Sequence, residues 1–184
     1  LMTMCLSVAV TDASIELGIP SVSIKWPNDL VAEAADVPLG YRKLGGILAE
    51  TAMSPVLGDC VILGLGLNVN WTGVPDELAA TATSLNSLSG QPVDREDLVI
   101  AILRRLDEVW LPAVEGSETA VQQLFDVYRQ RCSTLRRKVS IELPTGTLTG
   151  TATDIAPDGA LLVSSPNGIR TVTVGDVVHL RPQQ

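Results

Sequence analysis

The final third of the chain alternates apolar and polar residues over short stretches. These stretches are Val139–Leu143, Leu148–Ile155, Ala160–Ser164 and Thr171–Val174. Triplets that open with Pro and close with Gly separate them: Pro144–Gly146, Pro157–Gly159 and Pro166–Gly168. A period of two is typical of half-buried strands, and Pro and Gly favour tight turns. The pattern predicts a small β-barrel or sandwich that docks on the rest of the chain to bury enough apolar surface.

The preceding residues predict helices packed on a sheet. Helical spacing of apolar residues covers Met2–Leu17 and resumes after Asp94, up to Pro112, and after Ser117, up to about Cys132. Strands are expected at Val22–Trp26, Asp29–Glu33, Leu44–Thr51 and Val61–Val69. The second and third of these form a long hairpin, and the fourth is predicted to be central because it is the most apolar. We expect two domains, residues 1–135 and residues 136–184.

Composition excludes several classes of function. Thirteen basic against 21 acidic residues give a net charge of −8, which disfavours nucleic-acid binding. No stretch is long and apolar enough for a membrane span, and the apolar N-terminus lacks the basic start of a signal peptide. Three scattered cysteines predict buried thiols in a reducing compartment, hence the cytoplasm. A single histidine, His179, expected at the surface, cannot build a zinc site or a Ser-His-Asp triad.

Two lysines stand at the ends of strands that belong to one hairpin. Lys25 opens the segment Lys-Trp-Pro-Asn-Asp, and Lys43 opens Lys-Leu-Gly-Gly-Ile. Solvated surface lysines are the plainer interpretation, since most charged side chains are exposed. If both point toward one pocket, their ammonium groups repel, and an anion bound between them would reverse the sign. We therefore expect Lys25 and Lys43 to flank an anion-binding pocket.

The segment Gly64-Leu65-Gly66-Leu67-Asn68 closes the most apolar strand. It is not a dinucleotide fingerprint, because the third glycine is missing and no helix follows. Two interpretations stay open for it. The glycines either allow tight strand packing, with Asn68 as a turn residue, or let a planar ligand lie against the backbone while Asn68 bonds its edge.

Taken in order, these motifs resemble those of the biotin protein ligases. The matching segments are Lys-Trp-Pro-Asn-Asp at 25–29, Arg-Lys-Leu-Gly-Gly-Ile-Leu-Ala-Glu at 42–50, Leu-Gly-Leu-Gly-Leu-Asn-Val at 63–69 and Gly-Asp-Val-Val-His-Leu-Arg at 175–181. The resemblance implies an α+β catalytic domain with a mixed, mostly antiparallel sheet, similar to class II synthetases, followed by an SH3-like β-barrel. The chain departs from the family in lacking a basic glycine-rich loop before the first helix, which leaves open whether it acts alone.

The resemblance also implies roles for individual residues. Lys43 and Lys25 would be catalytic, Lys43 contacting the biotin carboxylate and Lys25 neutralising phosphates. The biotin pocket would be lined by Lys43, Gly46, Ile47, Gly64 and Trp26. ATP or the adenylate would be held by Asn28, Asp29, Asn68, Trp71 and Arg181, with Asp29 placing Mg²⁺. Residues 71–82 would fold over the adenylate.

The implied reaction uses ATP to activate biotin as biotinyl-5′-adenylate and then transfers biotin to a lysine of a biotin carboxyl carrier protein. It requires positioning and positive charge rather than an enzyme nucleophile. Two alternatives remain: a non-catalytic module of the same fold that binds adenylate or a partner, and a lipoate–protein ligase. The sequence leaves open whether the chain forms a homodimer.

Overall fold

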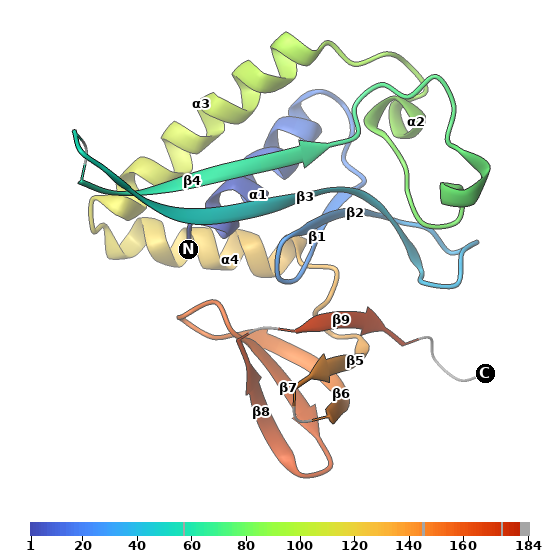
Figure 1. Ribbon diagram of the computed structural model, residues 1–184, viewed down its shortest axis with the longest axis vertical. Helices are drawn as coiled ribbons and strands as arrows, with labels where there is room; N and C mark the ends of the chain where they lie inside the picture. The colour runs from blue at the N-terminus through green and yellow to red at the C-terminus, as the bar shows by residue number, and fades with distance from the viewer. Residues whose placement is uncertain (57, 145, 174, 181–184) are drawn as a thin grey trace.

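The computed structural model describes residues 1–56, 58–144, 146–173 and 175–180. It contains two antiparallel sheets, with the principal helices packed against the first (Figure 1). The first sheet, with its helices, precedes a five-stranded second sheet at the C-terminal end of the chain. This arrangement confirms the α+β class, including the antiparallel sheet with helices and the separate C-terminal sheet.

The first sheet has the order β1-β2-β3-β4, and all its strands are antiparallel neighbours. Its strands are β1 (Val22–Lys25), β2 (Asp29–Glu33), β3 (Tyr41–Ser54) and β4 (Gly58–Leu67). The prediction that the last strand is central is wrong for the described residues, because β4 lies at an edge. Leu63, Leu65 and Leu67 pack on the helical core, whereas Gly64 and Gly66 line a cavity. Helices therefore cover one face of this apolar strand, and the other face is open to the cavity.

The principal helices are α1 (Met2–Glu16), α3 (Arg95–Val114) and α4 (Glu118–Arg131). Helix α1 packs against the first sheet and is in turn contacted by α3 and α4 (Figure 1). Asp94 accepts hydrogen bonds from the backbone N–H groups of Glu96 and Asp97 at the start of α3, as a capping residue does. Helix α3 continues past Pro112, which was predicted to end it.

The second sheet has the order β8-β7-β6-β5-β9. Its strands are β5 (Lys138–Leu143), β6 (Gly146–Ile155), β7 (Leu161–Ser165), β8 (Gly168–Val172) and β9 (Asp176–His179). The first three strand stretches predicted from alternation each coincide with most of a strand, and Val174 at the end of the fourth lies outside the described residues.

One apolar core joins the second sheet to the first part of the chain. It contains Met4 and Cys5 of α1, Tyr128 of α4, and Val139 and Val163 of the second sheet. The Trp26 indole N–H donates a hydrogen bond to the Gly159 carbonyl at 2.9 Å across this junction. His179, expected at the surface, is only 5% exposed, because β9 lies at this junction. Docking of the second sheet, rather than local sequence, therefore determines its burial.

Candidate active site

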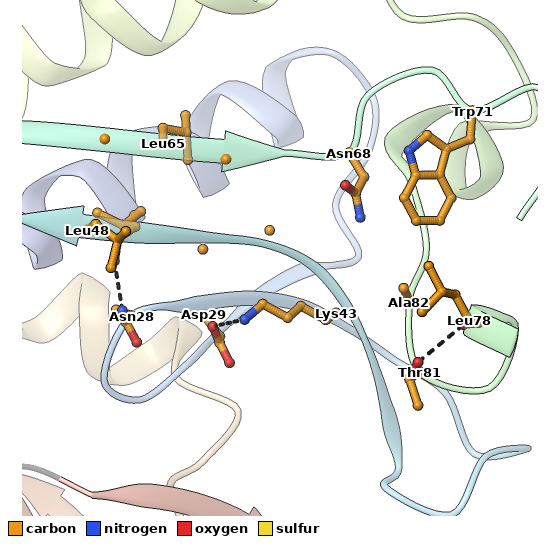
Figure 2. A pocket seen from close by; sticks show the side chains of 15 residues that line it. Asn28, Asp29, Lys43, Leu48, Leu65, Asn68, Trp71, Leu78, Thr81 and Ala82 are labelled. Carbon is orange, nitrogen blue, oxygen red and sulfur yellow. Dashed lines mark hydrogen bonds and ion pairs between the residues drawn. The ribbon is translucent and has the colours of Figure 1, made fainter. Parts of the chain in front are cut away.

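An open cavity of about 880 Å³ lies over the first sheet and under the segment that follows β4. The strands contribute Asp29, Lys43 and a group of glycines, and the turn between β1 and β2 contributes Asn28 (Figure 2). The segment after β4 lies on the other side and contributes Trp71, Leu78, Thr81 and Ala82. That segment includes a short 3-10 helix, η1 (Asp76–Leu78), and leads to the short helix α2 (Leu85–Ser89). The size is that of a cavity for a substrate or cofactor of moderate size.

Asp29 carries the charged contacts of the cavity. Its Oδ1 lies 2.6 Å from the Lys43 Nζ, and its Oδ2 lies 3.6 Å from the Lys25 Nζ. Lys43 is 52% exposed, whereas the Lys25 side chain is 5% exposed. Because two ammonium groups share one carboxylate, these three side chains together keep one positive charge, and Lys43 presents it to the cavity.

Backbone pairing fixes the position of Lys43. Its N–H donates to the Thr81 carbonyl at 2.7 Å, and its carbonyl accepts from the Thr83 N–H at 2.9 Å. Residues 43 and 82 thereby form an isolated parallel bridge outside the named strands. The segment that follows β4 is therefore tied to the residue that presents the positive charge.

Two asparagines link the segments that surround the cavity. The Asn28 side-chain amide donates to the Ile47 carbonyl at 2.7 Å, and the Asn68 amide donates to the Thr83 carbonyl at 3.0 Å. Asn28 follows the Trp26–Pro27 peptide bond, which is cis, in the turn that joins β1 to β2. These bonds fix the orientation of both amides, which is how a binding group is held ready for a ligand.

Glycines form the part of the cavity wall contributed by β3 and β4. A Cβ atom on Gly45 would lie 2.2 Å from the Gly66 carbonyl oxygen, too close for any side chain. At Gly64 the nearest atom to such a Cβ, the Leu48 carbonyl oxygen, would be 4.0 Å away. Gly45 is therefore required by strand packing, whereas Gly64 leaves open space over the strand that a ligand can occupy.

The structure brings together most of the residues expected at the site. Those that line the cavity are Asn28, Asp29, Lys43, Gly46, Ile47, Gly64, Asn68 and Trp71. Lys25 is not among the lining residues and lies behind Asp29. Trp26, expected in the biotin pocket, is instead 2% exposed in the core that joins the two sheets. Arg181 lies outside the described residues.

Sequence reasoning missed several lining residues. They are Gly45, Leu48 and Leu65 on the strands. Gly66 was expected only as part of the glycine pair, and Leu78, Thr81 and Ala82 only as part of the range 71–82. Period-two alternation was the available signal for Leu48, because Gly46 and Leu48 lie on the same face of β3. It does not identify Gly45 or Leu65, which stand at the opposite phase of the alternation. The residues after β4 carry no periodic signal, so nothing local distinguishes the ones that face the cavity.

The carboxylate oxygens of Asp29 are not arranged to bind a resident metal ion. Both carboxylate oxygens face ammonium groups, and the described part of the chain holds no cluster of three or more His, Cys, Asp or Glu side chains arranged for a metal. Protein-held Mg²⁺ usually takes oxygen ligands free of competing cations.

No helix in the described ranges has the length and hydropathy needed to cross a bilayer.

Two family models match the chain on either side of the helices α3 and α4. The Biotin/lipoate A/B protein ligase family model matches residues 2–68, which include Asp29, Lys43 and the glycine wall. The Biotin protein ligase C terminal domain model matches residues 134–180, which include the second sheet.

Two similar proteins are a biotin ligase and a bifunctional ligase/repressor. The biotin–[acetyl-CoA-carboxylase] ligase of Mycobacterium tuberculosis is 38% identical over 159 residues, covering 86% of this chain and 53% of that protein. The bifunctional ligase/repressor BirA of Bacillus subtilis is 29% identical, covering 96% of this chain and 52% of that protein. The chain thus spans about half the length of these relatives.

A solved structure matches across both sheets. The biotin protein ligase of Aquifex aeolicus in complex with biotin and ATP superposes with a TM-score of 0.77 at 25% identity, covering 99% of this chain and 72% of that one. A biotin protein ligase-like protein of unknown function from a Silicibacter species shares the fold, with a TM-score of 0.68 at 15% identity. With the two model matches and the motifs around Asp29, this shows that the chain belongs to the biotin protein ligase family.

Proposed function

We propose that the protein activates biotin with ATP and transfers it to a lysine of a biotin carboxyl carrier protein. The observation that supports this most is the pairing of Lys25 and Lys43 on Asp29 at a cavity of substrate size. That arrangement offers a positive charge beside an uncharged glycine wall, as a bound acyl phosphate beside a flat ring system requires. The relatives named as biotin ligases add the identity of the acid and the nucleotide.

In the proposed reaction, a carboxylate oxygen of biotin attacks the α-phosphorus of ATP and pyrophosphate leaves. The amine of the acceptor lysine then attacks the acyl carbon, loses a proton and displaces AMP. Lys43, which reaches the cavity, stabilises negative charge on the carboxylate and the α-phosphate. Asn68 and Trp71 hold the nucleotide ring. These assignments require no covalent enzyme intermediate, and any Mg²⁺ would arrive bound to ATP.

We assign residues 1–135 to the catalytic domain and residues 136–184 to the C-terminal domain. Two of the three cysteines, Cys5 and Cys132, are buried, Cys60 is partly buried, and all are free thiols, which agrees with a reducing compartment such as the cytoplasm. The acceptor is a folded carrier domain that presents one lysine.

The direct test incubates the chain with biotin, ATP and a carrier domain and follows the carrier by mass spectrometry. We expect the mass of one biotinyl group to be added to the acceptor lysine, and no addition when that lysine is replaced by arginine. Absence of transfer, even after a separate polypeptide with the family's basic glycine-rich loop is supplied, would rule out this function.

Two alternatives are separated by the same materials. A lipoate ligase would modify the acceptor with lipoate in preference to biotin when both are present. A non-catalytic module would bind a stable biotinyl-adenylate analogue without releasing pyrophosphate from ATP.

A further inference from the structure

Lys25 is buried and has an aromatic neighbour that the reaction itself does not use. Its Nζ lies 5.7 Å from the centroid of the Tyr41 ring, within the range of a cation–π contact. The Lys25 side chain is 5% exposed, and Tyr41 is 8% exposed at the start of β3. Burial strengthens such a contact, because water does not screen it.

The Tyr41 ring is in turn held by the second sheet. The His179 ring of β9 meets it edge to face, with centroids 5.1 Å apart and planes at 67°. The His179 Nε2 lies 3.1 Å from the Thr134 hydroxyl, which accepts a hydrogen bond from the backbone N–H of Trp26 at 3.0 Å. Trp26 follows Lys25 directly, so the contacts return to the strand that carries the lysine.

Charge explains why the position of Lys25 matters although Lys25 does not line the cavity. If Lys25 moved away from Asp29, the carboxylate would face Lys43 alone and cancel its charge. An anionic ligand would then meet a neutral pair. With Lys25 in place, one positive charge remains for the ligand. Burial lowers the pKa of His179 to about 4, with the charges of Arg137 and Lys25 adding to the effect, so the neighbouring imidazole is neutral at pH 7.

We propose that Tyr41 and His179 are positioning residues through which the C-terminal sheet keeps Lys25 on Asp29, so that Lys43 retains its charge for a phosphate-bearing ligand. The proposal rests on the proposed function, since it concerns the same cavity. It predicts a specific defect: loss of the preference for ligands that carry a phosphate, without an equal loss for the same ligand lacking it.

The test compares binding of AMP and adenosine to the 184-residue chain by calorimetry. Tyr41→Leu, which removes the ring, and His179→Leu, which removes its support, are expected to weaken AMP binding by about threefold to tenfold and leave adenosine binding unchanged. Tyr41→Phe keeps the ring and is expected to keep the AMP preference. Val163→Ala, a buried truncation in the same sheet, controls for loosening of the second domain. An equal loss for AMP and adenosine in Tyr41→Leu would overturn the proposal.

A second measurement does not depend on ligand binding. The chain has only three lysines, Lys25, Lys43 and Lys138, so their side-chain ε-CH₂ signals can be assigned by NMR with Lys25→Arg. The Lys25 signal is expected upfield of that of exposed Lys138, and this displacement should disappear in Tyr41→Leu and shrink in His179→Leu. A Lys25 signal that is unchanged in both variants would overturn the proposal. If the unaltered chain binds neither AMP nor adenosine, the proposed function fails, and the NMR result still decides the inference.

Discussion

Lys25 and Lys43 share the carboxylate of Asp29, each through a different oxygen, at 3.6 and 2.6 Å. Lys25 is buried and Lys43 is half exposed, so only Lys43 can contact a ligand in the cavity. The sequence suggested that an external anion would lie between the two lysines. In the structure the chain supplies that anion itself, and the remaining charge is directed outward through Lys43.

Replacing Lys43 by alanine should abolish activation without unfolding the protein. We expect biotin-dependent ATP–pyrophosphate exchange to fall by about 100-fold or more, because a preorganised charge at the reacting phosphate is lost. The thermal midpoint should stay near that of the unaltered chain, since the Lys43 side chain is 52% exposed. Lys138→Ala, at an exposed lysine of the second sheet, is the matched control and should exchange normally. Near-normal exchange by Lys43→Ala would remove Lys43 from the mechanism.

Asp29→Asn should cost stability as well as activity. Lys25 would lose its counter-charge while remaining buried, and we expect the free energy of unfolding to fall by about 1–3 kcal/mol. Urea denaturation measures this loss. Adding Lys25→Met to Asp29→Asn should recover part of the stability, because the uncompensated charge is gone. If the double variant is as unstable as the sum of the two single changes, the two side chains are not coupled.

Gly45 and Gly64 should respond differently to alanine. Gly45→Ala would place a methyl group against the Gly66 carbonyl, so we expect a loss of about 2 kcal/mol or more in unfolding free energy. Gly64→Ala has room for its methyl group and should unfold like the unaltered chain, but should weaken binding of an adenylate analogue because Gly64 lines the cavity. Denaturation and calorimetry on both variants check this; equal stability of the two would contradict the account of the glycine wall.

His179 should make stability depend on pH. The folded state holds its pKa at about 4, against an ordinary value of 6.5, so the unfolded chain binds the proton more tightly. Stability from this residue is therefore complete above pH 6.5 and is lost as pH falls toward 4, by up to about 3 kcal/mol. Denaturation at pH 7 and pH 5 compares the chain with His179→Gln. His179 is the only histidine, so the variant should lose most of the difference; an unchanged difference would show that His179 is not responsible.

The local sequence pattern predicted where helices and strands lie better than it predicted which of them are buried or central. Local patterns located β1 and β2, and the onset of helical spacing after Asp94 and Ser117 located the starts of α3 and α4, because these signals involve near neighbours. The edge position of β4 and the burial of His179 depend on which elements pack together. Neither is encoded in the period of a single segment.

The candidate site shows the same division. Lys43, Asp29, Asn68 and Gly64 lie in recognisable motifs, and all line the cavity. Trp26 lies in the same kind of motif, but its alternation with Lys25 predicts only that its side chain is on the apolar side of the strand. In the structure Trp26 packs at the junction between the two sheets. Lys25 lies beside Asp29, but its side chain is more deeply buried than the sequence suggested. The residues that bury it, such as Tyr41, come from a later strand.

The most direct test of the central claim is calorimetry of a non-hydrolysable biotinyl-adenylate analogue with the unaltered chain and with Lys43→Ala. We expect saturable binding at one site per chain by the unaltered protein and at least about tenfold weaker binding by the variant. No heat from the unaltered chain at high ligand concentration, or equal affinity in the two proteins, would contradict the claim that this cavity holds an anionic acyl nucleotide through Lys43.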